Sequence, residues 1–503
     1  MSTIAIGPAA KPATPATPEA EVKYWGLFAA FAALLIVCLL PTPKDLPIAG
    51  QIMLGMLLFS VILWMTEAVD YAVSAVLIVA LMAFLLGMAP DPAKPQAVLG
   101  TSAALGMALG GFANTALALV AAALFLSAAM TITGLDKRIA LFVLSKVGAR
   151  TNRVLIGAIV VGVVLSFLVP STTARVACLV PIMMGIILAF GVERKSRLAG
   201  ILMIATAQSA SIWNVGIKTA SAQNMVAVGF IEKTLKVTIT WLDWFIAAAP
   251  WAVLMSIALY FIMMKMMPPE TEEVAGGKEA IAKALAEMGS MKTSEKKLLF
   301  ITLVLLGLWA TEKVLHPFDT SSTTIAAIAI MFMPWIGVMG WKSAQGRIPW
   351  GTIVLFGVGI SLGTALLQTK AAGWLANLIV QGMGLQGATA FAVLALLSLF
   401  LIVVHLGFAS ATALASAMIP IMISVLQHVQ TPGLNIVGMT MILQFVVSFG
   451  FILPVNAPQN MVAYGTETFA VKDFVRTGLA LTVVGYLLVL LFGVSYWSWL
   501  GYV

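Results

Sequence analysis

Long apolar runs separated by short polar loops dominate the sequence. A helix needs about 20 apolar residues to cross a bilayer, and these runs are continuous, whereas the strands of a spanning β-barrel alternate between apolar and polar residues. We therefore expect an all-α polytopic membrane protein with about 11 transmembrane helices. The runs that predict single spans are residues 24–41, 50–66, 71–90, 112–133, 201–229, 244–266, 298–311, 322–340, 350–369, 438–466 and 477–500.

Two further apolar stretches, 154–190 and 388–427, are too long for one helix. The first is interrupted by LVPSTTA, in which Pro170 stands beside three hydroxyl residues, and basic residues flank it on both sides. Because basic loops face the cytoplasm, both of its ends are expected there. Each arm of about 15 residues would rise roughly 22 Å, which is short of a hydrocarbon core of about 30 Å. We therefore interpret both stretches as re-entrant hairpins.

The two halves of the chain are related in sequence. SAQNMVAVG begins at Ser221 and APQNMVAYG begins 236 residues later at Ala457, and the two nonamers share six of nine residues. STTARVACLVP at Ser171 and SATALASAMIP at Ser410 are 239 residues apart. A third pair, LSAAMTITGLDKRIA and LGTALLQTKAAGWLA, repeats the spacing of 236. Three matched blocks in the same order indicate a duplication.

Charge orients the two halves. The second hairpin lies in a region without lysine or arginine, from Ala371 to Val471, so it is expected to open on the outer side. The halves are then inverted, with the amino terminus inside and the carboxyl terminus outside. The expected organisation is a disordered cytoplasmic tail (1–23), a first inverted repeat (24–266) with hairpin 154–190, a cytoplasmic linker (267–298) and a second inverted repeat (299–503) with hairpin 388–427.

Composition agrees with this class and excludes others. Hydrophobic residues make up 61% of the 503 residues and charged residues 10%, against about 45–50% and 25% in soluble proteins, which could not bury so much apolar surface. The formal net charge of +8 lies in short loops, where membrane orientation accounts for it, so no nucleic-acid partner is expected. The sequence contains no zinc motif, phosphate-binding loop or Gly-x-Ser-x-Gly, so neither a cofactor nor enzyme activity is expected.

Inverted repeats with broken helices are an architecture of secondary transporters, in which the substrate binds near mid-membrane between the repeats. The amino ends of half-helices direct N–H groups and a positive dipole at an anion. Ser171, Thr172 and Thr173 open the second arm of the first hairpin, and Ser410 and Thr412 open the second arm of the other. Such facing hydroxyl and N–H groups suit the two ends of a dianion. The alternative is that these hydroxyls only cap helices.

At these positions the chain resembles the divalent anion/sodium symporter family, which contains sodium-coupled carboxylate and sulfate transporters and carboxylate exchangers. Family hairpins carry Ser-Asn-Thr, and STTA at Ser171 and SATA at Ser410 fall on these triplets. VSFGFILPVNAPQNMVA, which ends at Ala463, is similar to the family signature. GLDKRIALFVLSKVGARTNR, followed by PSTTAR, resembles the bacterial citrate/succinate and tartrate/succinate exchangers.

The resemblance implies a homodimer in which a moving transport domain contains both hairpins. It also implies that a small organic dianion contacts the triplets and the helix breaks that follow the hairpins. In a sodium-coupled member, sodium would bind near Ser171 and Ser410. The implied substrate-binding residues are Ser171, Thr172, Thr173, Ser221, Ala222, Ser410, Ala411, Thr412, Ala457 and Pro458.

The sequence departs from the family at both triplet asparagines, which are Thr172 and Ala411 here. Two cations lie nearby in apolar stretches: Arg175, four residues after Ser171 and on the same helical face, and Lys218, inside the broken stretch. Intramembrane cations are costly and are usually functional. We therefore expect both to compensate the charge of the substrate in place of sodium. The alternative is that Arg175 pairs structurally and that Lys218 reaches an interface.

These features predict a carrier in the cytoplasmic (inner) membrane that exchanges di- or tricarboxylates such as succinate, malate or citrate. Fixed cations would make the empty carrier slow to cross, because unpaired buried charge is penalised. Sodium-coupled symport of dicarboxylates or sulfate is the alternative. An anion channel and an intramembrane enzyme are remote alternatives. The enzyme would need His405, five residues before Ser410, but no acidic partner lies near it in the sequence.

Overall fold

The computed structural model describes residues 22–91, 94–146, 150–189, 191–270 and 277–503. Within these ranges the chain is mainly helical, and the antiparallel strands β1 (Pro90–Asp91) and β2 (Lys94–Val98) form a small hairpin. Nine of the described helices are long and apolar enough to cross a membrane, and five apolar helices of 10–17 residues accompany them. The predicted helical membrane fold is thereby confirmed. Almost all of the predicted tail, 1–23, lies outside the described residues.

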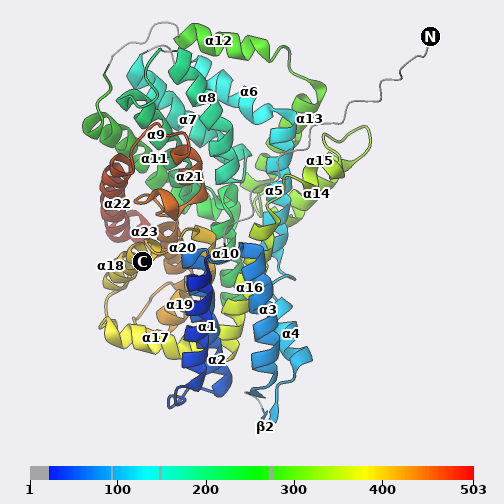
Figure 1. Cartoon of the computed structure of the whole chain (residues 1–503), viewed down its shortest axis with the longest axis vertical. Coiled ribbons are helices and arrows are strands. Elements are labelled where there is room, and N and C mark those ends of the chain that lie inside the picture. Colours follow the sequence, from blue (N-terminus) through cyan, green and yellow to red (C-terminus); the bar gives the residue numbers. More distant parts are fainter. Residues whose placement is uncertain (1–21, 92–93, 147–149, 190, 271–276) are drawn as a thin grey trace, which may run out of the picture.

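The first helices pack in pairs beside the second repeat. The helix α1 packs on α2, and α3 packs on both α4 and α16. In Figure 1 these helices, in blue, lie together in the lower half of the molecule. Their bounds are α1 (Tyr24–Leu39), α2 (Ile48–Thr66), α3 (Tyr71–Gly87) and α4 (Thr101–Leu109).

The duplicated blocks fold into matching series of elements. The first series is α5 (Thr115–Thr133), α6 (Leu135–Ser145), α7 (Thr151–Leu168), α8 (Thr172–Ala189), α9 (Arg197–Gly216), the 3-10 turn η1 (Lys218–Ala220), α10 (Ala222–Phe230), the π turn η2 (Ile231–Leu235) and α11 (Trp241–Met266). The second is α16 (Trp350–Gln368), α17 (Ala371–Gly382), α18 (Ala390–His405), α19 (Ala411–His428), α20 (Ile436–Val447), the 3-10 turn η3 (Pro454–Asn456), α21 (Pro458–Tyr464), α22 (Val471–Val494) and α23 (Tyr496–Trp499).

Each series places a short helix between a span and a hairpin. The helices α6 and α17 have 11 and 12 residues, about 17 Å of rise, which is too short to cross a bilayer. They lie toward opposite ends of the molecule in Figure 1. The hairpin arms that follow, α7 with α8 and α18 with α19, meet at breaks next to Ser171 and Ser410.

Two expectations about helix length differ from the structure. The arms α7 and α8 have 18 residues each, or about 27 Å, instead of about 15 residues. The helix α7 begins at Thr151, before the apolar run, and α8 begins at Thr172, inside the predicted break. The runs 201–229 and 438–466 are not continuous spans: α9 ends at Gly216 and α20 at Val447, and each is followed by an irregular segment and a short helix. These are the breaks that the family resemblance implies.

The described part of the linker between the repeats is largely helical. It contains α12 (Gly277–Glu287), and α13 (Thr293–Ala310) already begins inside the predicted range 267–298. The side chain of Ile281 is buried because α12 packs on α6 and α8, and Figure 1 shows α12 beside them at one end of the molecule. The next helices are α14 (Thr320–Phe332) and α15 (Trp341–Gln345).

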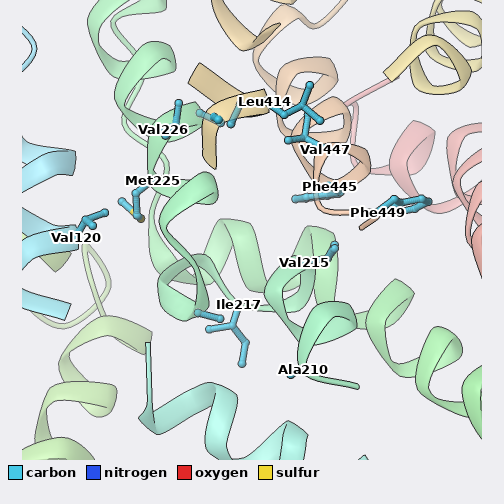
Figure 2. Packing of buried hydrophobic residues seen from close by; sticks show 14 of the residues in the cluster. Val120, Ala210, Val215, Ile217, Met225, Val226, Leu414, Phe445, Val447 and Phe449 are labelled. Atoms are coloured by element: carbon cyan, nitrogen blue, oxygen red, sulfur yellow. The ribbon is translucent and has the colours of Figure 1, made fainter. Parts of the chain in front are cut away.

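Helices from both repeats share one apolar core around α9. Every residue of α9 from Leu198 to Gly216 is buried, and only Arg197 at its start is exposed. Figure 2 shows apolar side chains of different helices gathered close together, among them Val215 of α9, Met225 of α10, Leu414 of α19 and Phe445 of α20. The helices α7 and α8 of the first hairpin both pack on α9, so the two hairpins and the two broken helices form one packed body.

Candidate substrate-binding site

The two hairpin tips and the two helix breaks surround a single cavity of about 1010 Å³. The cavity extends toward α6, α12 and the loop before α16, where Lys137, Ile281 and Arg347 line it. All ten substrate-binding residues implied by the resemblance line its walls: Ser171, Thr172, Thr173, Ser221, Ala222, Ser410, Ala411, Thr412, Ala457 and Pro458. Their binding of substrate stays a prediction, but the fold brings them to one place.

Both hairpin tips cap their second arm with serine. The Ser171 Oγ accepts a hydrogen bond from the Ala174 N–H at 3.4 Å, and the Ser410 Oγ accepts one from the Ala413 N–H at 3.3 Å. Capping, the alternative named above, therefore occurs at both tips. A capping hydroxyl accepts with its oxygen and still has its own hydrogen to donate. Capping and anion binding are thus compatible at these serines.

The two helix breaks are braced by a pair of asparagines in equivalent positions. Asn224 Nδ2 donates to the carbonyls of Asn214 (2.6 Å), Ile217 (3.1 Å) and Lys218 (3.4 Å). Asn460 Nδ2 donates to the carbonyls of Gly450 (2.8 Å) and Leu453 (3.4 Å), which are the equivalents of the first two. Sequence reasoning missed this role, although both asparagines are among the identical residues of the matched nonamers.

Arg175 is fully buried behind the first tip. Its guanidinium donates to five oxygen atoms: the carbonyls of Val169 (3.0 Å), Ala220 (3.2 Å) and Ala210 (3.3 Å), Thr172 Oγ1 (3.3 Å) and Asn214 Oδ1 (2.6 Å). All five are neutral acceptors, and among the described residues no carboxylate forms a salt bridge with it. Arg175 therefore keeps an uncompensated positive charge.

The cavity wall contains Thr172 and Asn214 but not Arg175 itself. Thr172 Oγ1 and Arg175 both donate to Asn214 Oδ1, at 2.6 Å each. Because this oxygen is occupied twice, the Asn214 amide directs its NH₂ group elsewhere as a donor. Arg175 thus acts on the cavity through one layer of hydrogen-bonded side chains rather than by contact.

Lys218 lies in a different environment from the one expected. Its Nζ donates to the carbonyl of Ile239 at 2.6 Å, and Lys218 does not line the cavity. Glu312 and Glu232 attract its charge electrostatically. The side chain is therefore directed toward the loop before α11, and of the two cations Arg175 has the closer relation to the cavity.

At the second tip a neutral side chain donates to the backbone carbonyls that the break leaves without a helical partner. Asn456 Nδ2 donates to the carbonyls of His405 (3.0 Å), Leu406 (3.3 Å) and Phe408 (3.0 Å) at the end of α18. Phe408 is the equivalent of Val169, whose carbonyl accepts from Arg175. In both halves a protein side chain donates to the carbonyl oxygens exposed by the break.

His405 is buried, and neither ring nitrogen has a hydrogen-bond partner in the described part of the chain. The Ser410 hydroxyl accepts from Ala413 instead. The described residues also contain no cluster of three His, Cys, Asp or Glu side chains that would hold a metal ion. A cation at the tips would have to bind to carbonyl and hydroxyl oxygens.

The end of the cavity beneath α12 carries charged groups of both signs. The side chains of Lys137 and Arg347 are exposed, whereas Asp136 is buried and accepts from the Lys137 N–H at 2.7 Å. Burial raises the pKa of the Asp136 carboxyl above its ordinary value. Two basic side chains lie beside one carboxyl, so the net charge at this end of the cavity is positive and attracts anions.

Replacing single hydroxyls at the tips should weaken binding. Each of Ser171→Ala and Thr412→Ala removes a donor to a carboxylate, a loss of about 1.5–3 kcal/mol, and should raise KM roughly ten- to one-hundred-fold. Initial rates of uptake into proteoliposomes give KM, and Ser343→Ala, at an exposed position of α15, is the control. Unchanged substrate affinity in both tip variants would refute the assignment of the tips.

Comparisons with known proteins agree with this geometry. The family model of the sodium:sulfate symporter transmembrane region matches residues 21–503. A membrane protein of Cupriavidus necator is 57% identical, over 95% of this chain and 93% of its own length. The citrate/succinate antiporter of Escherichia coli K12 is 25% identical, over 94% of this chain and 98% of its own length.

A solved structure supports the fold independently. The YdaH transporter of Alcanivorax borkumensis matches with a TM-score of 0.57 and 15% sequence identity, over 86% of this chain and 98% of that chain. At this identity the match concerns the fold alone. The family match covers nearly the whole chain and includes both hairpins and both helix breaks. The chain is a membrane transporter that belongs to the sodium:sulfate symporter family.

Proposed function

We propose that this protein exchanges di- or tricarboxylate anions across the bacterial inner membrane without sodium. The uncompensated charge of Arg175, held behind Thr172 and Asn214, is the observation that carries the proposal. A dianion taken out of water costs several kcal/mol per charge unless positive charge compensates it. In this chain the protein supplies that charge permanently. The citrate/succinate antiporter among its relatives supports a carboxylate as the anion.

The oxygen atoms at the tips argue against a bound sodium ion. The carbonyls of Val169 and Ala220 already accept from Arg175, and that of Phe408 accepts from Asn456. A sodium ion about 4 Å from the guanidinium would be repelled by about 4 kcal/mol at an effective dielectric constant of about 20. The first tip would therefore exclude sodium on electrostatic grounds alone.

Exchange follows from the same charge. When the substrate leaves, the guanidinium stays buried without a counter-charge, and moving it across the membrane is then costly. The loaded carrier has its charge balanced and crosses more easily. Net transport in one direction would need the empty carrier to return, so one anion must be traded for another.

Counterflow in proteoliposomes tests the proposal. Labelled succinate should enter vesicles that contain unlabelled dicarboxylate, at the same rate when choline replaces sodium, and should hardly enter vesicles without internal anion. Concentrative uptake into anion-free vesicles under a sodium gradient, with a sigmoidal dependence on sodium, would overturn it in favour of sodium-coupled symport. A flux that does not saturate with succinate would indicate a channel instead.

The proposal includes inverted repeats within a homodimer, as family membership suggests. In a chain without Cys38 and Cys178, a cysteine at the exposed position of Gln386 should react with an impermeant thiol reagent from outside, and one at Lys195 only from inside. Gln386 lies before α18 and Lys195 after α8, so each position marks the open end of one hairpin and their opposite labelling reports inversion. Labelling of both from one side would contradict it.

A further inference from the structure

Two glutamines in equivalent positions face the cavity from the helix breaks. Gln223 lies in the first turn of α10 and Gln459 in the first turn of α21, 236 residues apart, and both line the cavity with only 7% and 6% of their surface exposed. They come directly after the residues predicted to bind substrate at each break, and both are among the identical residues of the matched nonamers.

Each glutamine is held by the opposite repeat. Gln459 Nε2 donates to Ser211 Oγ of α9 at 3.0 Å, and Gln223 Nε2 donates to Ser448 Oγ, which follows α20, at 3.5 Å. One N–H of each amide is thereby fixed across the interface between the repeats. The amides cannot rotate freely, so their remaining groups have a defined direction.

Those remaining groups are a carbonyl oxygen and a second N–H on each side chain. Among the described residues no hydrogen bond uses the Oε1 of Gln223 or Gln459, and neither oxygen is one of the buried atoms without a partner. The neighbouring asparagines contrast with them, because the Oδ1 atoms of Asn224 and Asn460 are sealed inside the protein. The glutamine amides therefore offer both an acceptor and a donor to a molecule in the cavity.

A ligand that displaces water from the cavity must carry hydrogen-bond donors of its own to pair with these oxygens. The serine hydroxyls at the tips offer hydrogen atoms, which suit carboxylates, while Asn214 Oδ1 is already occupied by Thr172 and Arg175. Carboxylates and sulfate carry no donor at neutral pH, so they would leave both glutamine oxygens unpaired. A hydroxyl group next to a carboxylate pairs with a carboxamide at both ends, since its O–H donates to Oε1 while the carboxylate accepts the N–H.

We propose that Gln223 and Gln459 select anions that carry a hydroxyl group beside a carboxylate, such as malate, over unsubstituted dicarboxylates and sulfate. The inference rests on the proposed function, because it assigns a substrate class to the same cavity. A site built to pair with a substrate hydroxyl discriminates against the analogue without it, since the buried polar groups of the site then lose their partner.

Malate and succinate form the matched test pair, because they differ by one hydroxyl group. Each is added as a competitor of labelled succinate in counterflow, with both malate enantiomers tested and the tighter one scored. For the unaltered protein, malate should compete at a concentration roughly tenfold or more below that of succinate. For Gln223→Met and Gln459→Met this ratio should fall toward one, mainly through weaker competition by malate.

Gln444→Met is the matched control, because Gln444 is an equally buried amide of α20 that does not line the cavity. Its malate-to-succinate ratio should equal that of the unaltered protein. Thermal stabilisation of the purified protein provides a second readout that needs no variant, and malate should raise Tm at lower concentrations than succinate.

The outcomes separate this inference from the proposed function. If neither a dicarboxylate nor citrate is exchanged, the proposed function fails. If succinate is exchanged but malate competes no better, or if both glutamine variants keep the original ratio, the glutamine assignment is wrong while exchange stands.

Discussion

Arg175→Gln should lose nearly all counterflow while keeping its fold. The substituted amide can still donate to carbonyl oxygens around it, such as those of Val169 and Ala220, so the break remains partly satisfied. The positive charge, however, is gone, and a buried dianion without compensation costs several kcal/mol. A loss of about 3 kcal/mol corresponds to a rate at least roughly one-hundred-fold lower. Initial counterflow rates at saturating and subsaturating succinate measure the effect.

Two further variants identify the cause. Arg175→Lys keeps the charge but not the five hydrogen bonds, and should recover part of the activity. Lys218→Met removes a cation that is equally buried but directed at Ile239, away from the cavity, and should cost much less than Arg175→Gln. Size-exclusion chromatography and Tm verify that each variant folds. If Arg175→Gln exchanges succinate at the original rate, the fixed charge has no part in transport.

Asn224→Leu should produce the largest loss of stability. The leucine has the same number and branching of side-chain heavy atoms as asparagine, but it leaves three carbonyls, those of Asn214, Ile217 and Lys218, without the donor that satisfies them. Each buried acceptor that loses its partner costs about 1–3 kcal/mol. We expect a loss of about 3 kcal/mol or more in the free energy of unfolding, seen as a lower Tm in detergent and a lower yield of folded protein.

The equivalent asparagine of the second repeat provides a comparison for the stability loss of Asn224→Leu. Asn460→Leu removes the donor of two carbonyls instead of three, so its destabilisation should be smaller. Asn152→Leu, on an exposed position, is the control and should change Tm little. The expected order of effects is therefore Asn224, Asn460, Asn152. Equal effects at all three positions would show that the breaks do not depend on these amides.

The features that sequence could predict are those with a strong local signal. Pro170 beside three hydroxyl residues marks a helix break, because proline cannot donate to the helix and hydroxyls cap the next one. The repeat spacing then transfers this break to Ser410 without a proline there. The family resemblance added the two helix breaks to the tips, and residues as far apart in the chain as Thr172 and Pro458 line one cavity in the structure.

Other features depend on packing that no local pattern reveals. The position of Lys218 inside the broken stretch was apparent from the sequence. The direction of its side chain, however, is set by the carbonyl of Ile239, which the fold brings near it. The sequence did not predict the helix α12, because its short apolar face around Ile281 is surrounded by charged residues. The helix is stabilised by packing on α6 and α8. The donor role of Asn456 likewise requires the end of α18 to lie beside η3.

The different donors at the two tips have a consequence for how this chain evolved. Backbone carbonyls belong to no side chain, so duplication copied the acceptors into both halves and neither half could lose them by mutation. Only the donors were free to diverge: the equivalent of Arg175 is Leu414, and the equivalent of Asn456 is Ala220. One half came to hold a charge and the other to remain neutral. A chain rebuilt from two copies of the same half would contain two buried cations or none, so neither version would keep the single fixed charge on which the proposed exchange depends.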